Sequence, residues 1–531
     1  MSETSSIVGG GIPDAPCGKG FLSRIGIGEY VYDTVRDVED AVPYGGKNMK
    51  LKDLLQDIPV LESTADPELD IENVYYDSRK VTPGSLFVAV SGFAADGNRF
   101  IPMALNKGAV ALVTAKKPEG EVPYILVPSD RMALALLGCN FYGHPAEAMT
   151  MIGVTGTNGK TSVTLLLKQV LEKTIGAKVG LIGTMANMVG EEIIPTERTT
   201  PESFELQGLF ARMRDAGCTH VVMEVSSHAI TLERIGGTYF DIAAFTNLTE
   251  DHLDFHKTMD AYCDAKADLF RRCRKAVVNV DDSYSGRILE AAACPVLTTS
   301  VKGASDLSAK DLALLSEGIR FTAVSEGREI PVTLPIPGKF TVYNALTVMG
   351  IAKQLGISPS DCAAALKTAQ GVKGRVEVVP TPGMPWSILV DYAHTPDGLE
   401  NVLSSVKDFC KGRLIALFGC GGDRDPMKRP VMGEIGVKLS DLAIITSDNP
   451  RTEDPMAIIE DILKGVKKEH GEYIVMEDRR AAIRYAMDIA KKDDIIVLAG
   501  KGHETYQEVG GIKHHLDERE EVAAHLAELR K

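Results

Sequence analysis

The chain has 531 residues, 44 % of them hydrophobic, and at roughly 100–200 residues per domain this length predicts about two to four globular domains. With 73 acidic and 58 basic residues, its formal net charge is −15, which argues against a general nucleic-acid-binding role because a polyanion would be repelled. The nine cysteines include no C-x-x-C pair, so neither a zinc site nor a disulfide framework is expected.

The N-terminal 48 residues are rich in glycine and lack sustained periodicity, so we interpret residues 1–48 as an extension of unknown role. Met49 opens the stretch "MKLKDLL", which predicts the beginning of a helix. No apolar run is long enough to span a bilayer, and the N-terminus carries no basic stretch followed by an apolar core. We therefore expect a cytoplasmic protein that does not insert into membranes.

Three segments of an α/β fold follow in chain order. Short apolar runs between turn residues predict a small mixed α/β domain over 49–145, with strands at "SLFVAV" and "AVALVT". Residues 146–372 alternate buried-type strands with helical stretches, which predicts a central parallel sheet covered by helices; its strands are "MIGVTG", "VGLIG", "HVVMEVSS", "IAAFTNL" and "KAVVNVD". The same alternation restarts over 373–531 and predicts a doubly wound Rossmann-like domain, with strands "SILVDYA", "RLIALFGC", "LAIITSD", "YIVMED" and "DIIVLAG".

A phosphate-binding loop is predicted at "GVTGTNGKTS", residues 153–162, although the strict pattern G-x-x-x-x-G-K-[ST] fails because Val154 stands where its first glycine belongs. A strand, a glycine-rich turn and a helix that starts near Lys160 direct backbone N–H groups at an anion. Lys160 supplies a charge for phosphate, and Thr161 a hydroxyl oxygen for Mg²⁺. The alternative is a tight turn in which Gly156 and Gly159 only permit the backbone path, but G-K-T between a strand and a helix favours the phosphate site.

Acidic and histidine side chains follow two further strands of the central domain. Glu224 ends the strand in "MEVSSH", where it could bind Mg²⁺ or cap the next turn. The stretch "TNLTEDHLDFH" brings Asp251, His252, Asp254 and His256 into six residues, a density typical of metal or catalytic sites. A solvated turn with capping aspartates remains an equal alternative.

Two arginines follow strand ends in the last domain: Arg424 in "FGCGGDRD" and Arg451 in "SDNPRTEDP". Paired guanidinium groups could bind a carboxylate bidentately. The stretch "GKGHETYQ" adds Lys501, His503 and Glu504 at the same edge. A set of surface ion pairs is the alternative interpretation.

Taken together, these motifs resemble the Mur ligase family, ATP-dependent amide-forming enzymes of peptidoglycan synthesis whose phosphate loop is spelled G-T-x-G-K-[ST], as in "GTNGKT". The absence of glycine at 154 is usual in that family. The similarity extends over nearly all of Met49 to Lys531, through "DSR", "TTP", "MEVSSH", "TNLTEDHLDFH", "YNALT", "DYAHTP", "GCGGDRD", "DNPR" and "GKGHE".

The combination of "DSRKVTPGSLFVAVSG", "MEVSSH" and "DNPR" is similar to the family members that add diaminopimelate. The resemblance implies ATP, Mg²⁺, a UDP-N-acetylmuramoyl-dipeptide and meso-diaminopimelate as ligands, and we expect a monomer. A lysine-adding homologue and a folylpolyglutamate synthase-like ligase are the nearest alternatives. A P-loop kinase or NTPase switch would use the central domain alone.

The resemblance also implies the site residues. ATP would be held by Gly156, Thr157, Asn158, Gly159, Lys160, Thr161, Ser162, Asn344, Arg375, Asp391 and His394. The UDP-muramoyl-dipeptide would be held by Ser78, Phe93, Ala94, Ala95, Thr199, Thr200, Ser226 and Arg234. Diaminopimelate would be held by Arg424, Asp448, Asn449, Pro450, Arg451, Gly500 and Glu504. Two departures affect substrate contacts, since some members carry asparagine in place of Arg198 and glutamine in place of Leu232.

The catalytic residues implied by the resemblance are Lys160, Glu224, His252 and Lys266. Lys266 lies in "DAYCDAKADLF", a helical stretch in which local sequence indicates only an ion-paired surface lysine. By resemblance it would be carbamylated and would bind Mg²⁺ together with Thr161, Glu224 and His252. A glutamyl carboxylate would attack the γ-phosphate of ATP, an amine would displace phosphate, and closure of the third domain would complete the site.

Overall fold

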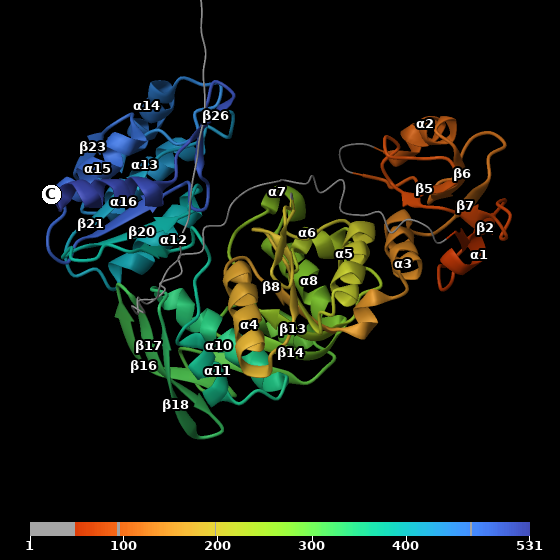
Figure 1. Cartoon of the computed structure of the whole chain (residues 1–531), viewed down its shortest axis with the longest axis horizontal. Helices are drawn as coiled ribbons and strands as arrows, with labels where there is room; N and C mark the ends of the chain where they lie inside the picture. The colour runs from red at the N-terminus through yellow and green to blue at the C-terminus, as the bar shows by residue number, and fades with distance from the viewer. Residues whose placement is uncertain (1–47, 93–95, 197, 468–469, 531) are drawn as a thin grey trace, which may run out of the picture. The chain divides into compact units, whose positions relative to one another are not determined.

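The computed structural model describes residues 48–530 except 93–95, 197 and 468–469, and it contains three α/β domains (Figure 1). The predicted extension, apart from Asn48, therefore lies outside the described residues, as do Phe93, Ala94 and Ala95 of the predicted nucleotide-binding set. No helix in the described part of the chain combines the length and apolarity that crossing a bilayer requires.

The first domain is built on a five-stranded sheet in the order β2-β7-β6-β5-β4. Its strands are β2 (Glu62–Ser63), β4 (Val74–Tyr75), β5 (Ser85–Val88), β6 (Ala109–Thr114) and β7 (Tyr124–Leu126), with helices α1 (Leu51–Leu54), α2 (Ile101–Asn106) and α3 (Asp130–Tyr142). The predicted strands at β5 and β6 are confirmed. The predicted helix start at Met49 is wrong by two residues, because Met49 and Lys50 form β1 (Met49–Lys50), which pairs with β3 (Asp70–Ile71).

The central domain contains an eleven-stranded sheet in the order β11-β10-β9-β12-β8-β13-β14-β15-β16-β17-β18. Its parallel strands are β9 (Val179–Ile182), β12 (His220–Glu224), β8 (Thr150–Thr155), β13 (Phe240–Phe245), β14 (Cys273–Asn279) and β15 (Val296–Ser300). The predicted parallel sheet is thus confirmed.

Further strands extend both edges of this sheet, which the sequence analysis did not predict. At one edge β10 (Asn187–Val189) and β11 (Glu192–Ile194) add antiparallel pairings. At the other edge β16 (Leu307–Leu315) pairs parallel with β15, and β17 (Gly318–Ser325) and β18 (Arg328–Leu334) continue it with antiparallel pairings.

Helices complete the central domain, and α4 and α10 pack side by side (Figure 1). The helices are α4 (Lys160–Ile175), α5 (Ser203–Asp215), α6 (Ser227–Thr231), α7 (Leu253–His256), α8 (Met259–Ala267), α9 (Ser285–Ala291), α10 (Lys339–Gln354) and α11 (Pro359–Leu366).

Strand β8 carries apolar side chains into both faces of the central sheet, because successive residues of a strand point to opposite sides. Ile152 and Val154 belong to one core cluster, together with apolar side chains of α4 and α10. Met151 belongs to a second cluster, which includes Leu206 and Phe210 of α5. Burial on both faces explains why the sequence of β8 reads as a continuous apolar run.

The C-terminal domain has a six-stranded sheet in the order β19-β20-β24-β21-β22-β23. Its strands are β19 (Glu377–Val379), β20 (Ser387–Asp391), β21 (Leu414–Phe418), β22 (Leu442–Ile445), β23 (Tyr473–Val475) and β24 (Ile495–Ala499). All five predicted strands are confirmed, and β19 is an additional antiparallel edge strand.

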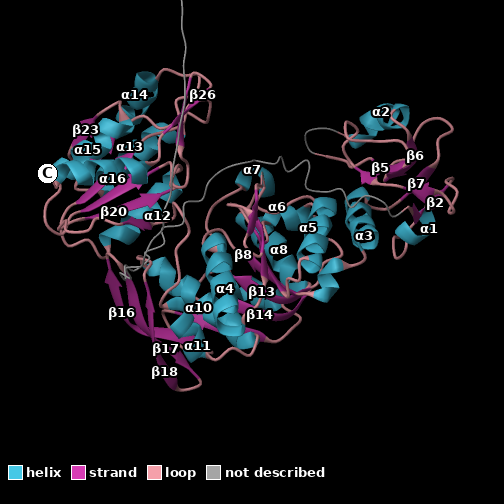
Figure 2. Cartoon of the chain, viewed as in Figure 1, coloured by secondary structure: helices cyan, strands magenta, loops and turns pink. Residues whose placement is uncertain are grey.

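Four helices follow β20 to β23 as predicted: α12 (Pro396–Lys407), α13 (Lys428–Leu439), α14 (Pro455–Val466) and α15 (Arg479–Ile489). Strand β24 is followed instead by a hairpin, β25 (Tyr506–Val509) and β26 (Ile512–His515), and by α16 (Glu518–Leu529). Figure 2 shows the strands of this sheet in magenta among their cyan helices.

Candidate active site

The phosphate loop joins β8 to α4, and two glycines make its path possible. Gly156 has φ of +148°, and a Cβ there would lie 1.9 Å from Thr246 Oγ1. Gly159 has φ of +88°, and a Cβ there would lie 2.5 Å from Asn344 Oδ1. Only glycine combines these backbone angles with such close approaches. The loop is therefore held between the end of β13 and the helix α10.

Two lysine side chains converge on one carbonyl of this loop. Lys160 Nζ donates to the carbonyl oxygens of Gly156 (2.9 Å) and Thr157 (2.8 Å). Lys266 Nζ, from α8, donates to the same Gly156 oxygen at 2.9 Å. Burial lowers the pKa of Lys160, and burial together with repulsion from Lys160 holds the pKa of Lys266 well below its usual range.

The interpretation of Lys266 as a surface ion-paired lysine is wrong, since its side chain is only 1 % exposed. Its ammonium group also lies 4.5 Å from the centre of the Tyr262 ring. The face of α8 that carries Lys266 turns toward the loop, a tertiary contact that local periodicity does not reveal.

The segment after β13 fixes the tip of the loop. Thr249 N donates to Thr157 Oγ1 (3.0 Å), and Asn158 N donates to Asn247 Oδ1 (2.9 Å). Thr246 Oγ1 donates to Asn158 O (2.7 Å). These bonds hold Thr157 and Asn158 in place at the tip of the loop.

A pocket beside the loop brings together three of the predicted ATP-binding residues. Ser162 of α4, Asn344 of α10 and Arg375 all line it, together with Leu166 and Phe340. Arg375 also lowers the pKa of Lys160 in addition to the larger effect of burial, so its positive charge acts on the phosphate loop.

Two more residues of the predicted ATP set lie at the end of β20: Asp391 is its last residue, and His394 follows it. Asp391 is buried and accepts from Val376 N (2.7 Å) and Ala393 N (2.8 Å). Burial raises its pKa, and the nearby Arg375 opposes this rise. His394 Nδ1 lies 2.8 Å from the carbonyl oxygen of Tyr392.

Glu224 ends β12 next to the loop, and its side chain is 1 % exposed. Its two carboxylate oxygens accept from the backbone N (2.9 Å) and the hydroxyl group (3.1 Å) of Thr184. The capping alternative is wrong, because Ser226 caps α6 by accepting from Ala229 N. Sequence reasoning missed Thr184, which lies 40 positions before Glu224 in the loop between β9 and β10.

His252 precedes α7 with φ of +54° and lies in a group of aromatic rings. Its ring centre is 4.8 Å from that of His228 and 6.0 Å from that of Tyr262, the ring that Lys266 contacts. Asp251 Oδ1 accepts from His252 N at 2.8 Å, but the N-cap of α7 is His252, which makes no side-chain cap bond. The segment therefore places a histidine beside the lysine site.

In the C-terminal domain, Asn449 is held in one orientation by three contacts. Its Oδ1 accepts from Lys501 Nζ (3.0 Å) and Glu508 N (2.9 Å), while its Nδ2 donates to Glu504 Oε2 (2.9 Å). Lys501 Nζ also lies 3.1 Å from Glu504 Oε2 and is completely buried. The alternative prediction of surface ion pairs therefore does not hold for Lys501 and Glu504. The sequence assigned no ligand role to Lys501.

Arg451, with φ of +52°, lies beside this group. Its Nη1 donates to Gly422 O (2.6 Å), and its Nε lies 3.5 Å from Glu508 Oε2 of β25. Pro450 precedes it, and its carbonyl oxygen would lie 2.0 Å from a Cβ at Gly422. Arg424 is exposed. The residues that the sequence resemblance predicts to hold the amino acid, Arg424, Asp448, Asn449, Pro450, Arg451, Gly500 and Glu504, are called the amino-acid clamp below.

Comparison with known proteins decides the family. Three family descriptions match: "Mur ligase family, catalytic domain" over residues 70–142, "Mur ligase middle domain" over 154–352, and "Mur ligase, glutamate ligase domain" over 374–502. The chain belongs to the Mur ligase family.

Similar proteins cover almost the whole of this Mur ligase. UDP-N-acetylmuramoyl-L-alanyl-D-glutamate–2,6-diaminopimelate ligase of Clostridium tetani is 47 % identical over 91 % of the chain and 100 % of its own length. The protein of the same name from Caldanaerobacter subterraneus subsp. tengcongensis is 47 % identical, again over 91 % of this chain and 100 % of its own. A solved structure of a ligase of that name has a TM-score of 0.70 and 31 % identity, and covers 91 % of this chain and 100 % of its own.

Four predicted substrate-binding residues of the Mur ligase surround the end of β12. Thr199 Oγ1 lies 3.0 Å from Thr184 Oγ1, and Thr200 Oγ1 donates to Glu224 O (2.9 Å). Ser226 N donates to Thr200 Oγ1 (3.3 Å), and Arg234 Nη1 donates to Thr200 O (3.1 Å). Ser78 belongs to the first domain, where it is buried with its hydroxyl group 3.3 Å from Met103 Sδ.

Proposed function

We propose that the chain catalyses the ATP-dependent addition of meso-diaminopimelate to the D-glutamyl side-chain carboxylate of UDP-N-acetylmuramoyl-L-alanyl-D-glutamate, a step of peptidoglycan synthesis. The observation that carries this proposal is the 47 % identity, along 91 % of the chain, with a ligase whose name states both substrates. The same identity favours diaminopimelate over lysine, and it favours this ligase over a folylpolyglutamate synthase.

The reaction proceeds through an acyl phosphate. The glutamyl carboxylate attacks the γ-phosphorus of ATP, the bond to the ADP oxygen breaks, and the amine of diaminopimelate then displaces phosphate and loses a proton. Two anions must approach each other in the first step, so positive charge has to be supplied between them. Lys160 is suited to this role because its ammonium group already lies on the loop, where Gly156 and Thr157 accept from it.

Mg²⁺ would be held by Thr161, Glu224, His252 and Lys266, and it would offset the charge of the two anions. Among the described residues no three His, Cys, Asp or Glu side chains form a metal-binding group, and Glu224 and Thr161 are the oxygen ligands of the proposed set. The Lys266 ammonium group does not fit a hard cation, but its carbamate would supply two oxygens. The lowered pKa of Lys266 favours the neutral amine that reacts with CO₂.

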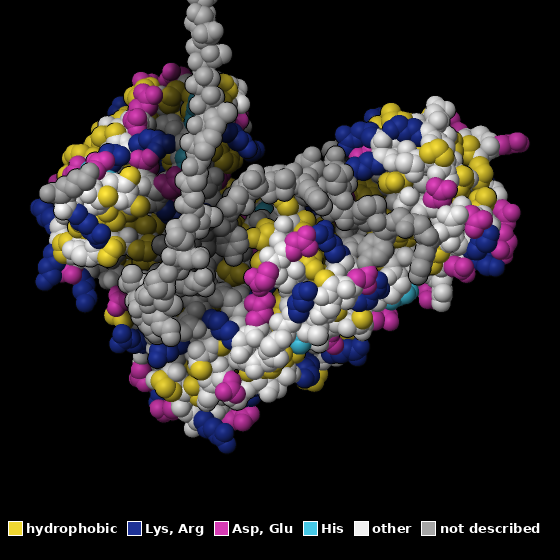
Figure 3. Space-filling view, in the orientation of Figure 1, with side chains coloured by type: hydrophobic (Ala, Val, Ile, Leu, Met, Phe, Trp, Pro, Cys, Tyr) yellow, Lys and Arg dark blue, Asp and Glu magenta, His cyan; other side chains and the backbone are white. Residues whose placement is uncertain are grey.

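The UDP-muramoyl-dipeptide would extend from the end of β12 to the first domain. Its peptide part would contact Thr199, Thr200, Ser226 and Arg234. Its uridine end would contact Ser78, Phe93, Ala94 and Ala95. Lys and Arg side chains gather over α2 (Figure 3). Arg99 precedes α2 and Lys107 follows it, and both are exposed, as is Arg79, whose carbonyl oxygen accepts from Lys107 Nζ. Their charge suits a diphosphate.

The amino-acid clamp would hold diaminopimelate by its distal end. Arg451 and Arg424 would bind the distal carboxylate, and Glu504 the neighbouring ammonium group. Lysine carries an ammonium group without that carboxylate, so Arg451 would repel it.

ATP would be held by Gly156, Thr157, Asn158, Gly159, Lys160, Thr161 and Ser162, with Asn344, Arg375, Asp391 and His394 at the boundary of two domains. Because Arg375 and Asp391 follow the central domain in the chain, closure of the C-terminal domain would complete the site. We further propose that the protein is a cytoplasmic monomer.

One assay tests the proposed function. Phosphate release from ATP is measured with the UDP-muramoyl-dipeptide and diaminopimelate added singly and then together. Sustained release that requires both substrates supports the ligase. Full release without diaminopimelate would point to a kinase or NTPase and contradict it.

A further inference from the structure

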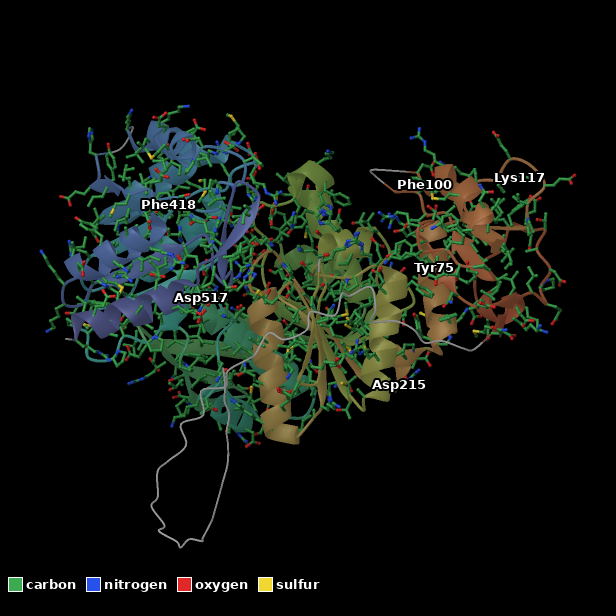
Figure 4. All side chains as sticks on the ribbon, turned by 45° about the horizontal axis from the view of Figure 1, so that its top comes forward. Tyr75, Phe100, Lys117, Asp215, Phe418 and Asp517 are labelled. Atoms are coloured by element: carbon green, nitrogen blue, oxygen red, sulfur yellow. The ribbon has the colours of Figure 1, made fainter. Side chains whose placement is uncertain are left out.

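Arg479 is a buried arginine behind the amino-acid clamp. It begins α15, and its side chain is completely buried. Its Nε donates to Glu518 Oε1 (2.9 Å), and its Nη2 donates to Ala499 O (2.8 Å) and lies 2.7 Å from Glu518 Oε1. Glu518 is itself fully buried at the beginning of α16, next to Asp517, which Figure 4 labels. The Arg479–Glu518 pair therefore connects α15, α16 and the end of β24.

The remaining nitrogen of this guanidinium group points toward the clamp. Arg479 Nη1 has no hydrogen-bond partner among the described residues, and it lies 4.0 Å from Asp448 Oδ2. Asp448 Oδ2 is also buried without a hydrogen-bond partner in the described part of the chain, while Oδ1 accepts from Asn449 N (2.7 Å). A buried donor and a buried acceptor thus face each other without a bond, which is costly unless another state satisfies them.

Gly500 leaves room for this arrangement. It directly follows Ala499, has φ of +118°, and a Cβ there would lie 2.5 Å from Asp448 Oδ2. Any larger residue at 500 would displace the Asp448 carboxylate. Arg479 therefore bonds Ala499, the residue directly before Gly500 of the clamp, and it faces the carboxylate of Asp448, another member of the clamp.

The charges explain why an arginine is suited to this place. Glu518 neutralises one buried positive charge, and the two groups share bonds at Nε and Nη2. A guanidinium group can bond a carboxylate on one side and offer a separate nitrogen on another, whereas a lysine ammonium group acts as a single point charge. The rigid fork can thus be anchored on Glu518 and still reach Asp448.

We propose that Arg479, anchored by Glu518, is a positioning residue for the amino-acid substrate. It sets the direction of the Asp448 carboxylate in the clamp, and the 4.0 Å separation closes to a hydrogen bond when the amino acid binds. This proposal rests on the proposed function, because it assumes that the clamp receives the incoming amino acid.

The test compares Arg479→Lys and Glu518→Gln with the wild-type enzyme. The KM for diaminopimelate, the KM for ATP, kcat and the thermal midpoint are measured for each. Misplacement of a binding group by about 1 Å can cost up to ~100-fold, so we expect the KM for diaminopimelate to rise at least about tenfold in both variants. The KM for ATP should change less than about twofold. Glu518→Asp keeps the anchoring charge and should recover part of the loss.

Arg413→Lys is the matched control. Arg413 also bonds a buried carboxylate in this domain, with its Nε 3.0 Å and its Nη2 2.7 Å from Asp494 Oδ2. It lies directly before β21, at the end of the strand opposite to the clamp, and its side chain bonds Asp494 and the carbonyl oxygen of Ile489. This variant should lower the thermal midpoint while leaving the KM for diaminopimelate unchanged.

The possible results separate this proposal from the proposed function. If the wild-type enzyme does not use diaminopimelate, both the proposed function and the positioning role are wrong. If the wild-type enzyme is active but Arg479→Lys and Glu518→Gln lower only the thermal midpoint, as Arg413→Lys does, the positioning role is wrong. If Arg479→Lys does not fold, Glu518→Gln decides by the same KM comparison.

Discussion

The side chains of Lys160 and Lys266 donate to the same atom, the carbonyl oxygen of Gly156, at 2.9 Å each. Two cations that share one acceptor repel each other, and burial adds to the cost of charging either of them. The consequence is larger for Lys266, whose pKa is lowered by burial and then by Lys160. The fold thus favours a neutral amine at Lys266 beside the charged loop lysine.

The first prediction concerns stability against pH. In the unfolded chain Lys266 titrates near 10.5, whereas in the folded protein its pKa lies well below that value. At a pH between these two pKa values, the unfolded state binds a proton that the folded state does not. The contribution of this group to the free energy of unfolding therefore rises with pH, by at most about 1.4 kcal/mol per pH unit. Lys266→Met removes this dependence.

Urea unfolding at several values from pH 7 to 10 in CO₂-free buffer measures this effect. The stability of the wild-type protein should rise with pH relative to that of Lys266→Met. Lys275→Met, at an exposed position of β14, is the control and should follow the wild type. Parallel curves for the wild type and Lys266→Met would contradict the lowered pKa.

The second prediction concerns Glu224. Glu224→Gln preserves the shape of the side chain and an oxygen for Thr184 N, but it removes the charge proposed to bind Mg²⁺. We expect kcat to fall by about 100-fold or more, because a metal supplies several kcal/mol of charge stabilisation to phosphoryl transfer. Kinetics over a range of Mg²⁺ concentrations should show a higher requirement for the metal. Glu233→Gln, which disturbs only the Arg272–Glu233 ion pair, should remain near wild type.

The third prediction concerns substrate choice. Arg451→Ala removes the group proposed to bind the distal carboxylate, and losing one partner of a charged contact costs roughly 2–5 kcal/mol. We expect kcat/KM for diaminopimelate to fall at least about 30-fold, with the KM for ATP nearly unchanged. The wild-type enzyme should discriminate strongly against lysine. Equal turnover of lysine and diaminopimelate by the wild type would overturn the role of Arg451. Arg484→Ala, which removes an arginine that is ion-paired with Glu528, serves as the control.

Much of the site could be predicted because it lies at strand ends that the sequence marks clearly. Apolar runs locate β8 and β12, so the loop and Glu224 fall at the same edge of a parallel sheet. The same reasoning placed Arg424 and Arg451 beyond the ends of β21 and β22.

Other features depend on tertiary contacts that carry no local signal. Thr184 reaches Glu224 from a loop after a different strand, and Glu508 reaches Arg451 from the hairpin after β24. The burial of Lys266 could not be read from α8, because its periodicity is compatible with an exposed lysine. Short strands such as β10 and β11 were missed because three residues are too few to establish an alternating pattern.

The most direct test follows oxygen from the substrate carboxylate. The UDP-muramoyl-dipeptide is prepared with ¹⁸O in the D-glutamyl side-chain carboxylate and is turned over with ATP and diaminopimelate. The account predicts one ¹⁸O atom in each phosphate released, because that oxygen bridges carbon and phosphorus in the acyl phosphate. Unlabelled phosphate, or label found in AMP, would contradict it.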